Sequence, residues 1–309
     1  MEAQFVTRAY NNIKNTGDGC IFKKSSNNKI VNEINYFINL PEVVKPYFPE
    51  YVSADLSGDV KTLKLKYVDG RDLGYYLTNK QACEQLNWET IINKLIDSVS
   101  FFKSITKEST SIEKDKRLML IDKTYNEFLK FSKRDHTKWL TSQETLNVNG
   151  RQIKNFKLIW KDIKKLIEDI PSVNHSFIHG DLCFANILFS RDKNLYFVDP
   201  RGSYGTTRYC YGDYRYDYAK LLHSIEGGYE FIIRDKFKLH NLNFTLENYT
   251  KKDELLSIFK SKINKEEYAT ARLIQGLIYI GMCDRHYDSH DRQQIMYCTG
   301  IEILNDLLT

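Results

Sequence analysis

The sequence predicts an α+β fold with two lobes, a small β-rich lobe followed by a larger, mainly helical one. Three observations predict it. The chain has 309 residues, enough for one large domain or two smaller ones. Short alternating segments separated by turn residues dominate the start of the chain, and long segments with apolar residues at helical spacing follow. Because Asp69-Gly70 reads as a hinge, we divide the chain into lobes at residues 1–68 and 69–309.

The small lobe is expected to hold four strands and one helix. The expected strands are residues 5–10, 19–24, 52–54 and 62–68. A helix is expected over residues 30–40, where Ile30, Ile34 and Phe37 recur at helical spacing and Pro41 ends the pattern.

In the large lobe, helical periodicity predicts seven helices. They are residues 88–106, 118–131, 153–170, 216–224, 255–263, 266–279 and 293–308. Asn149-Gly150 is expected to be a turn. Two short apolar runs, 176–178 and 195–198, indicate a β-hairpin in the middle of this lobe.

The composition excludes several classes of protein. With 42% hydrophobic and 28% charged residues, the chain is not a disordered one. No apolar run approaches the roughly 20 residues that a membrane helix needs, and the first residues do not resemble a secretory signal. The six cysteines are scattered singly, so neither a zinc site nor a redox pair is indicated. We therefore expect a cytoplasmic protein with free thiols and no membrane partner.

The net charge of +5 does not by itself indicate nucleic-acid binding, and no such partner is expected. The charge is uneven, however, because residues 101–165 hold 16 Lys and Arg against 8 Asp and Glu. This excess indicates either solvated helix faces or a surface that attracts an anionic partner or substrate. No feature of the sequence indicates an oligomeric state.

The chemistry is concentrated in residues 177–202, FIHGDLCFANILFSRDKNLYFVDPRG. Asp181 and Asn186 are five residues apart after one short strand, and Asp199 follows another. Kinase-type phosphoryl transfer needs such a set, because Mg²⁺ must be held on the nucleotide phosphates and an acceptor hydroxyl must be oriented. Asn186 and Asp199 offer the oxygen ligands that Mg²⁺ prefers. Asp181 would orient the hydroxyl or accept its proton.

This His-Gly-Asp-x-x-x-x-Asn segment, with its strand-end Asp, resembles the aminoglycoside phosphotransferase and choline kinase family. The resemblance implies a protein-kinase-like fold, with ATP and Mg²⁺ as cofactors. It implies that Asp181 is the catalytic residue, that Asn186 and Asp199 hold the metal, and that Asp217 braces the catalytic loop. The segments around HGDLCFANILF, DPRG and YDYAKLLHSIEGGYEF look most like a bacterial branch associated with surface-polysaccharide synthesis.

A kinase also needs a strand lysine for the phosphates and a helix glutamate that pairs with it. Glu33 lies in the expected helix and is the candidate partner. The lysine is either Lys23 or Lys24, which point to opposite faces of their strand. We favour Lys24, since it continues the stripe of Cys20 and Phe22.

The adenine is expected to bond to the backbone of the hinge around Lys66 and Val68, because residues 65–73 resemble the family's hinge. No Gly-x-Gly-x-x-Gly precedes the lysine. Residues 15–19 offer a glycine-containing turn that could cover phosphates or serve as an ordinary hairpin turn.

Three residues are candidates for binding the acceptor. Arg201 would lie beside the transferred phosphate or an acidic acceptor, or else form an ion pair within the fold. His286 and Asp288 belong to a polar segment, 283–292, with no trusted metal-ligand spacing. This segment is either the mouth of the acceptor pocket or an exposed loop between helices.

The sequence therefore predicts an ATP- and Mg²⁺-dependent small-molecule kinase that acts on a hydroxyl group. The acceptor is expected to be a sugar, a polyol or an amino alcohol. The alternatives are an aminoglycoside kinase, which the basic middle region disfavours, and a nucleotide-binding pseudokinase that acts as a scaffold. Only 17 residues separate Asp199 from Asp217, too few for the activation segment of a regulated protein kinase.

Overall fold

The computed structural model describes residues 12–15 and 17–309. The small lobe is a four-stranded antiparallel sheet in the order β1-β2-β4-β3, with one helix packed against it. Its elements are β1 (Asn12–Asn15), β2 (Cys20–Ser25), α1 (Lys29–Ile38), η1 (Glu42–Tyr47), β3 (Tyr51–Asp55) and β4 (Lys61–Lys66). The strands expected at 19–24, 52–54 and 62–68 and the helix at 30–40 are confirmed within a few residues. The strand expected at 5–10 lies outside the described residues.

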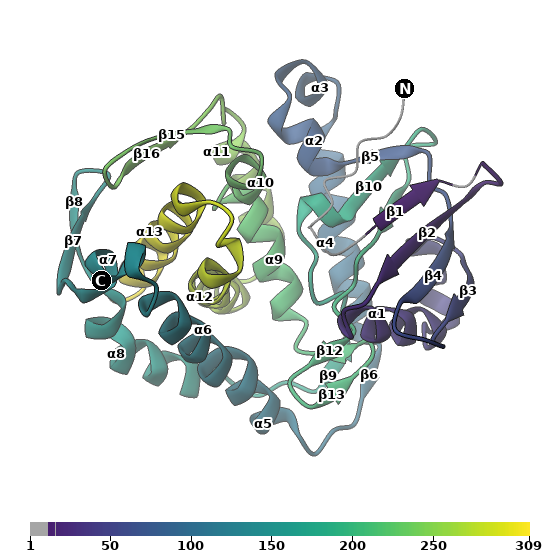
Figure 1. Ribbon diagram of the computed structural model, residues 1–309, viewed down its shortest axis with the longest axis horizontal. Coiled ribbons are helices and arrows are strands. Elements are labelled where there is room, and N and C mark those ends of the chain that lie inside the picture. Colours follow the sequence, from purple (N-terminus) through teal and green to yellow (C-terminus); the bar gives the residue numbers. More distant parts are fainter. Residues whose placement is uncertain (1–11, 16) are drawn as a thin grey trace.

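The chain crosses to the large lobe between β4 and β5 (Gly70–Asp72). Strand β5 pairs with β10 (Ile187–Ser190), and β10 pairs on its other side with β11 (Leu195–Phe197). In Figure 1 the small sheet and α1 stand on one side, the helices of the large lobe stand on the other, and β5 and β10 lie between them. The division at residue 68 fits this crossing, and we keep it as a proposal.

Helices make up most of the large lobe. They are α2 (Leu73–Thr78), α3 (Lys80–Glu84), α4 (Trp88–Ser104), α5 (Ile112–Lys116), α6 (Lys123–Ser132), α7 (Lys138–Ser142), α8 (Phe156–Glu168), α9 (Arg215–Ile225), α10 (Tyr229–Ile233), α11 (Lys252–Lys262), α12 (Lys265–Met282) and α13 (His290–Asp306). Asparagine side chains cap α4 and α12, since Asn87 accepts from the N–H of Thr90 and Asn264 from that of Glu267. Helix α9 is buried along its whole length, and α12 packs against it, so α9 forms the centre of the lobe.

Shorter elements complete the large lobe. They are β6 (Thr106–Lys107), η2 (Arg117–Asp122), η3 (Asp135–Thr137), β7 (Thr145–Val148), β8 (Arg151–Lys154), β9 (His175–Phe177), η4 (Phe184–Asn186), β12 (Ser203–Tyr204), β13 (Thr207–Arg208), β14 (Tyr211–Gly212), β15 (Phe237–His240), β16 (Asn243–Leu246) and η5 (Cys283–His286). Among the described residues, no helix is both long and apolar enough to cross a bilayer.

Three sequence expectations for this lobe were wrong in detail. The runs at 176–178 and 195–198 do not form one hairpin, because β9 lies between β14 and β6 while β11 pairs with β10. The helix expected at 153–170 begins only at Phe156, since Arg151–Lys154 pairs with Thr145–Val148 across the expected Asn149-Gly150 turn. The helix expected at 118–131 is divided, with the π-helical turn η2 leading into α6.

Candidate active site

The loop between β9 and β10 carries Asp181 and is held in place by a side chain of helix α9. The carboxylate of Asp217 accepts hydrogen bonds from the backbone N–H groups of His179 and Gly180, both at 2.7 Å. Burial raises the pKa of Asp217 to about 7, although the two N–H groups favour its ionised form. The side chain therefore positions the loop from beneath, as the family resemblance implied.

His179 supports the same loop from behind. Its Nε2 lies 3.0 Å from the carbonyl oxygen of Val198, and its Nδ1 accepts from the N–H of Asp181 at 3.2 Å. Burial lowers the pKa of His179 to about 4, so the ring is neutral at pH 7. A neutral ring protonated at Nε2 satisfies both bonds, which link the Asp181 loop to the end of β11 just before Asp199.

Asp181 faces an amine that the sequence did not indicate. Its Oδ1 lies 2.8 Å from Nζ of Lys220, which is buried on α9, one helical turn after Asp217. Burial opposes the charge on Lys220, but Asp181 and, to a lesser extent, Cys183, Tyr216 and Tyr229 together raise the pKa of the amine. The Asp181 side chain is 36% exposed, so a ligand can reach it.

On the small-lobe side, Lys23 joins two carboxylates. Its Nζ lies 2.6 Å from Oε2 of Glu33 and also forms an ion pair with Asp199. Burial disfavours its charge, but the two carboxylates raise the pKa of Lys23. Burial also raises the pKa of Glu33 to about 7, with Asp199 adding repulsion and Lys23 partly offsetting both. One lysine thus ties β2, α1 and the loop after β11 together.

The preference for Lys24 over Lys23 was wrong. Lys24 is exposed, whereas Lys23 is buried and points toward Asp199. Adjacent residues of a strand face opposite sides of the sheet, so only one of the pair can point inward. The stripe through Phe22 was misleading, because Phe22 is only half-buried and its ring is covered by the ammonium of Lys64, 5.0 Å from the ring centre.

Gly202 allows α1 to approach this loop. A Cβ on Gly202 would lie 2.3 Å from the carbonyl oxygen of Asn32, and the residue has φ = 69°. Only glycine meets both conditions without strain. Since Asn32 precedes Glu33, this close approach brings the segment of α1 that carries Glu33 against the loop that carries Asp199.

Asn186 and Asp199 have the chemistry of a Mg²⁺ site. The Asn186 side-chain N–H₂ donates to the carbonyl oxygen of Asp181 at 2.8 Å, which leaves its amide oxygen as a free ligand atom. The Asp199 side chain is half-exposed. Mg²⁺ commonly takes one or two protein ligands and fills its shell with water and phosphate oxygens, so this pair fits it. The described residues contain no cluster of three or more His, Cys, Asp and Glu side chains that would hold a metal alone.

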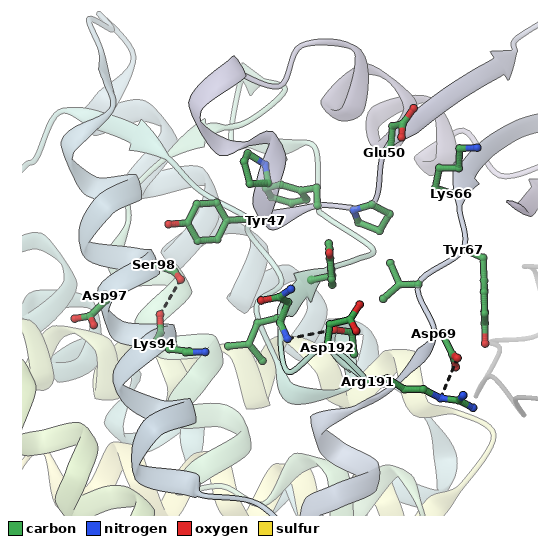
Figure 2. Close-up of a pocket in the computed structure, with 18 residues that line it drawn as sticks. Tyr47, Glu50, Lys66, Tyr67, Asp69, Lys94, Asp97, Ser98, Arg191 and Asp192 are labelled. Atoms are coloured by element: carbon green, nitrogen blue, oxygen red, sulfur yellow. Dashed lines mark hydrogen bonds and ion pairs between the residues drawn. The ribbon is translucent and has the colours of Figure 1, made fainter. Parts of the chain in front are cut away.

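The hinge residues Lys66 and Val68 lie where the chain passes from β4 to β5. Together with Tyr47, Asp97 and Arg191 they line a hollow of about 1010 Å³, shown in Figure 2. An ion pair of 2.9 Å between Arg191 and Asp69 lies at its edge. The residues that line this hollow do not include Lys23, Asp181 or Asp199.

The three acceptor candidates end up in different places. Arg201 extends toward η2, where one of its terminal nitrogens lies 3.6 Å from Sδ of Met119. His286 is buried, with its ring centre 6.3 Å from that of Tyr229. Asp288 is exposed and pairs with Arg292 at 3.2 Å. Arg201 and His286 thus lie on the large-lobe side of Asp181, while Asp288 belongs to a surface ion pair.

Two further buried side chains support the catalytic loop and were not expected from the sequence. Ser224 on α9 accepts from the N–H of Phe184 at 2.9 Å, and Glu230 on α10 accepts from that of Ala185 at 3.1 Å. The Ser224 hydroxyl donates to Glu230 at 2.9 Å. Neither residue lies in the motif, and the sequence signal for both is only that a polar residue interrupts an apolar helix.

The two lobes and this charged centre between them define the class of the protein as a kinase-type phosphotransferase. Residues 112–242 match the family model described as "Phosphotransferase enzyme family". This match includes the motif segment that carries the resemblance to aminoglycoside phosphotransferases and choline kinases. It supports a small-molecule phosphotransferase that acts on a hydroxyl group. No curated protein sequence matches the chain.

Solved structures confirm the protein-kinase-like fold. A thermostable mutant of the aminoglycoside phosphotransferase APH(4)-Ia, in its apo form, is 12% identical with a TM-score of 0.55, and the match covers 95% of this chain and 89% of that one. A ternary complex of that enzyme with ADP and hygromycin B is 11% identical with a TM-score of 0.55, over 97% and 95% of the two chains. A ternary complex of the same enzyme with AMP-PNP and hygromycin B is 11% identical with a TM-score of 0.53, over 97% and 95% of the two chains.

Proposed function

We propose that this protein transfers the γ-phosphate of ATP, with Mg²⁺, to a hydroxyl of a sugar, a polyol or an amino alcohol, in the synthesis of a cell-surface polysaccharide. The observation that carries the proposal is the arrangement of carboxylates around two buried lysines. Lys23 holds Glu33 and Asp199 on the small-lobe side, and Lys220 holds Asp181 on the other. This is the division of labour that phosphoryl transfer needs, with one group binding the nucleotide and another orienting the acceptor.

Each residue has a role in the proposal. Lys23 would bind the nucleotide phosphates, and Asn186 and Asp199 would hold Mg²⁺, whose charge neutralises the phosphate oxygens. The backbone of Lys66 and Val68 would contact the adenine. Support for a nucleotide also comes from the related complex with ADP.

Asp181 acts on the acceptor. The acceptor hydroxyl oxygen forms a bond to the γ-phosphorus, the bond from that phosphorus to the β–γ bridging oxygen breaks, and ADP leaves. The hydroxyl proton passes to the carboxylate of Asp181 and then to water. Lys220 keeps the carboxylate oriented and stabilises its charge before the proton arrives.

The test is ADP production with Mg²⁺ across a panel of sugars, polyols, amino alcohols and aminoglycosides. We expect acceptor-dependent turnover that is lost in Asp181→Asn, while Asp59→Asn, which removes an exposed carboxylate in a turn of the small lobe, keeps it. Nucleotide binding without turnover on any acceptor would support the pseudokinase alternative. No nucleotide binding would contradict the proposal as a whole.

A further inference from the structure

Four basic side chains gather on the large-lobe side of Asp181, and we call them the basic cluster. They come from the start of α6, the loop after β11, the middle of α9 and the turn η5: Lys123, Arg201, Lys220 and Arg285. The sequence spreads them over more than 160 residues, so only the fold brings them together. The nucleotide side of the site has its own amine, Lys23, which is already paired with Glu33 and Asp199.

Contacts made by η2 and α12 show how Arg201, Lys123 and Arg285 come close to one another. Arg201 lies against Met119, and Met119 is one helical turn before Lys123. A Cβ on Gly281 at the end of α12 would lie 4.0 Å from Cα of Thr124, which follows Lys123. Arg285 comes one turn after Gly281, in η5.

The remaining member, Lys220, contacts Asp181 directly. Its ammonium is 2.8 Å from Oδ1 of Asp181 and 5.6 Å from the ring centre of Tyr229. The ring of Tyr229 in turn lies 6.3 Å from that of His286, the neighbour of Arg285. Tyr229 therefore lies close both to Lys220 and to the turn η5.

Of the four members of the basic cluster, Lys220 alone forms an ion pair within the described part of the chain, with Asp181. Lys123, Arg201 and Arg285 have no ion pair with any described carboxylate. The neighbouring acids are engaged elsewhere, since Asp284 pairs with Arg134 at 2.5 Å and Asp288 with Arg292. The largest charge effects on Lys123 come from Arg201, Arg285 and Lys220, which are positive, and from Asp181, which is negative.

The crowding of positive charges disfavours the protonated form of Lys123. Burial, together with the positive charges of Arg201, Arg285 and Lys220, places the pKa of its amine well below the ordinary value. A ligand that brings a negative charge would relieve this repulsion, and a polycation would increase it. Guanidinium and ammonium groups bind carboxylate and phosphate oxygens through strong, charge-assisted hydrogen bonds.

We propose that the basic cluster binds an anionic group, a carboxylate or a phosphate ester, on the same small molecule whose hydroxyl is presented to Asp181. The inference rests on the proposed function and narrows its acceptor to an acidic sugar or an acidic polyol. It disfavours aminoglycosides, whose positive charges would meet the cluster.

The test uses acceptors in matched pairs: glucose with glucuronate, glycerol with glycerate and glycerol 3-phosphate, and ribitol with ribitol 5-phosphate, plus one aminoglycoside. Turnover is measured in the wild type, in Lys123→Gln and Arg285→Gln, and in Lys130→Gln. The last variant removes an exposed amine from the same helix, α6, and is the matched control. Binding of the anionic members is measured by calorimetry in parallel, with a non-hydrolysable ATP analogue present.

We expect an anionic member to exceed its neutral partner in kcat/KM by about tenfold or more, which is the size of a lost charged hydrogen bond. Lys123→Gln and Arg285→Gln remove that preference without changing the KM for ATP, and Lys130→Gln retains it.

Three results would overturn the inference while leaving the kinase function intact: equal use of neutral and anionic partners, preference for the aminoglycoside, or an unchanged preference in both variants. Wild-type protein that binds the nucleotide analogue but none of the anionic probes would also overturn it. In Asp181→Asn, turnover is lost and anion binding remains, so failure of the chemistry and failure of the anion site give different results.

Discussion

Lys220 Nζ lies 2.8 Å from Oδ1 of Asp181, so the candidate catalytic carboxylate is held by an amine from the buried helix α9. The catalytic loop itself offers no amine beside Asp181, because residues 179–186 contain neither Lys nor Arg and the nearby Cys183 is a buried thiol. The positive charge comes from Lys220, one helical turn beyond Asp217, the residue that positions the loop. A single helix thus sets both the shape of the catalytic loop and the electrostatics of its acid.

Replacement of this amine is predicted to damage catalysis more than binding. In Lys220→Met, Asp181 loses its orienting partner, and we expect kcat to fall by about a hundred-fold, within the usual range for disrupted acid–base groups, with little change in the KM for ATP. Steady-state kinetics measure this. Lys252→Met, at the exposed start of α11, is the control and should behave as wild type. A kcat within twofold of wild type in Lys220→Met would show that Asp181 needs no such partner.

The two adjacent lysines of β2 provide a paired test of the nucleotide side. Lys23→Ala breaks the ion pairs with Glu33 and Asp199, and we expect kcat/KM for ATP to fall by about a hundred-fold or more. Lys24→Ala removes an exposed side chain and should change stability by less than about 0.5 kcal/mol. If kcat/KM for ATP falls more in Lys24→Ala than in Lys23→Ala, Lys24 and not Lys23 binds the phosphates.

Gly202 is predicted to be irreplaceable because of its contact with α1. Gly202→Ala and Gly58→Ala both place a side chain at positive φ, at 69° and 66°. Only the first also meets backbone, since a Cβ at Gly58 has open space around it. We expect Gly58→Ala to cost about 1 kcal/mol of unfolding free energy from strain alone, and Gly202→Ala to cost more and to reduce activity. Denaturant melts and ATP turnover measure the difference, and equal values for the two variants would exclude a role for the Asn32 contact.

Stability is predicted to depend on pH through His223. The ring is buried between Tyr229 and Tyr279, with centres 4.3 and 4.2 Å away, and neither ring nitrogen has a hydrogen-bond partner among the described residues. Burial lowers the pKa of His223 well below its ordinary value. The unfolded residue titrates at about 6.5, so below that pH the unfolded state binds a proton that the folded state does not.

The unfolding free energy should therefore fall as the pH drops from about 7 to 5, by up to about 1.4 kcal/mol per pH unit from this one group. His223→Phe keeps the aromatic packing and removes the proton. Its unfolding free energy should decline less steeply over the same interval, as measured by denaturant melts at several pH values. Parallel slopes in the two proteins would mean that His223 is solvated or charged in the folded state.

The sequence predicted the two-lobed fold correctly, and it offered Asp181, Asn186 and Asp199 as candidate site residues because their motif is local. Its failures came from side chains whose surroundings are not local. Burial of Lys23 rather than Lys24 depends on which face of β2 meets α1, and hydrophobic neighbours could not show that. Lys123 and Arg285 are ordinary helix residues until η5 is packed against α6.

Some misses had a readable signal. The hairpin β7–β8 alternates apolar and polar residues on either side of Asn149-Gly150, which is a strong hairpin pattern. Strand β10 was overlooked because it begins directly after the motif residue Asn186, within a segment that was read only for its polar residues. For Lys220 the signal was weaker, since a lone lysine in an apolar helix is more often a surface residue.

The most direct test of the central claim is transfer of label from γ-phosphate-labelled ATP to the acceptor that gives the highest turnover. The account predicts labelled acceptor in the presence of Mg²⁺, with the label lost in Asp181→Asn and strongly reduced in Lys220→Met. Labelled acceptor formed equally well by Asp181→Asn would contradict the assignment of Asp181, and label released only as inorganic phosphate on every acceptor would contradict transfer to a hydroxyl.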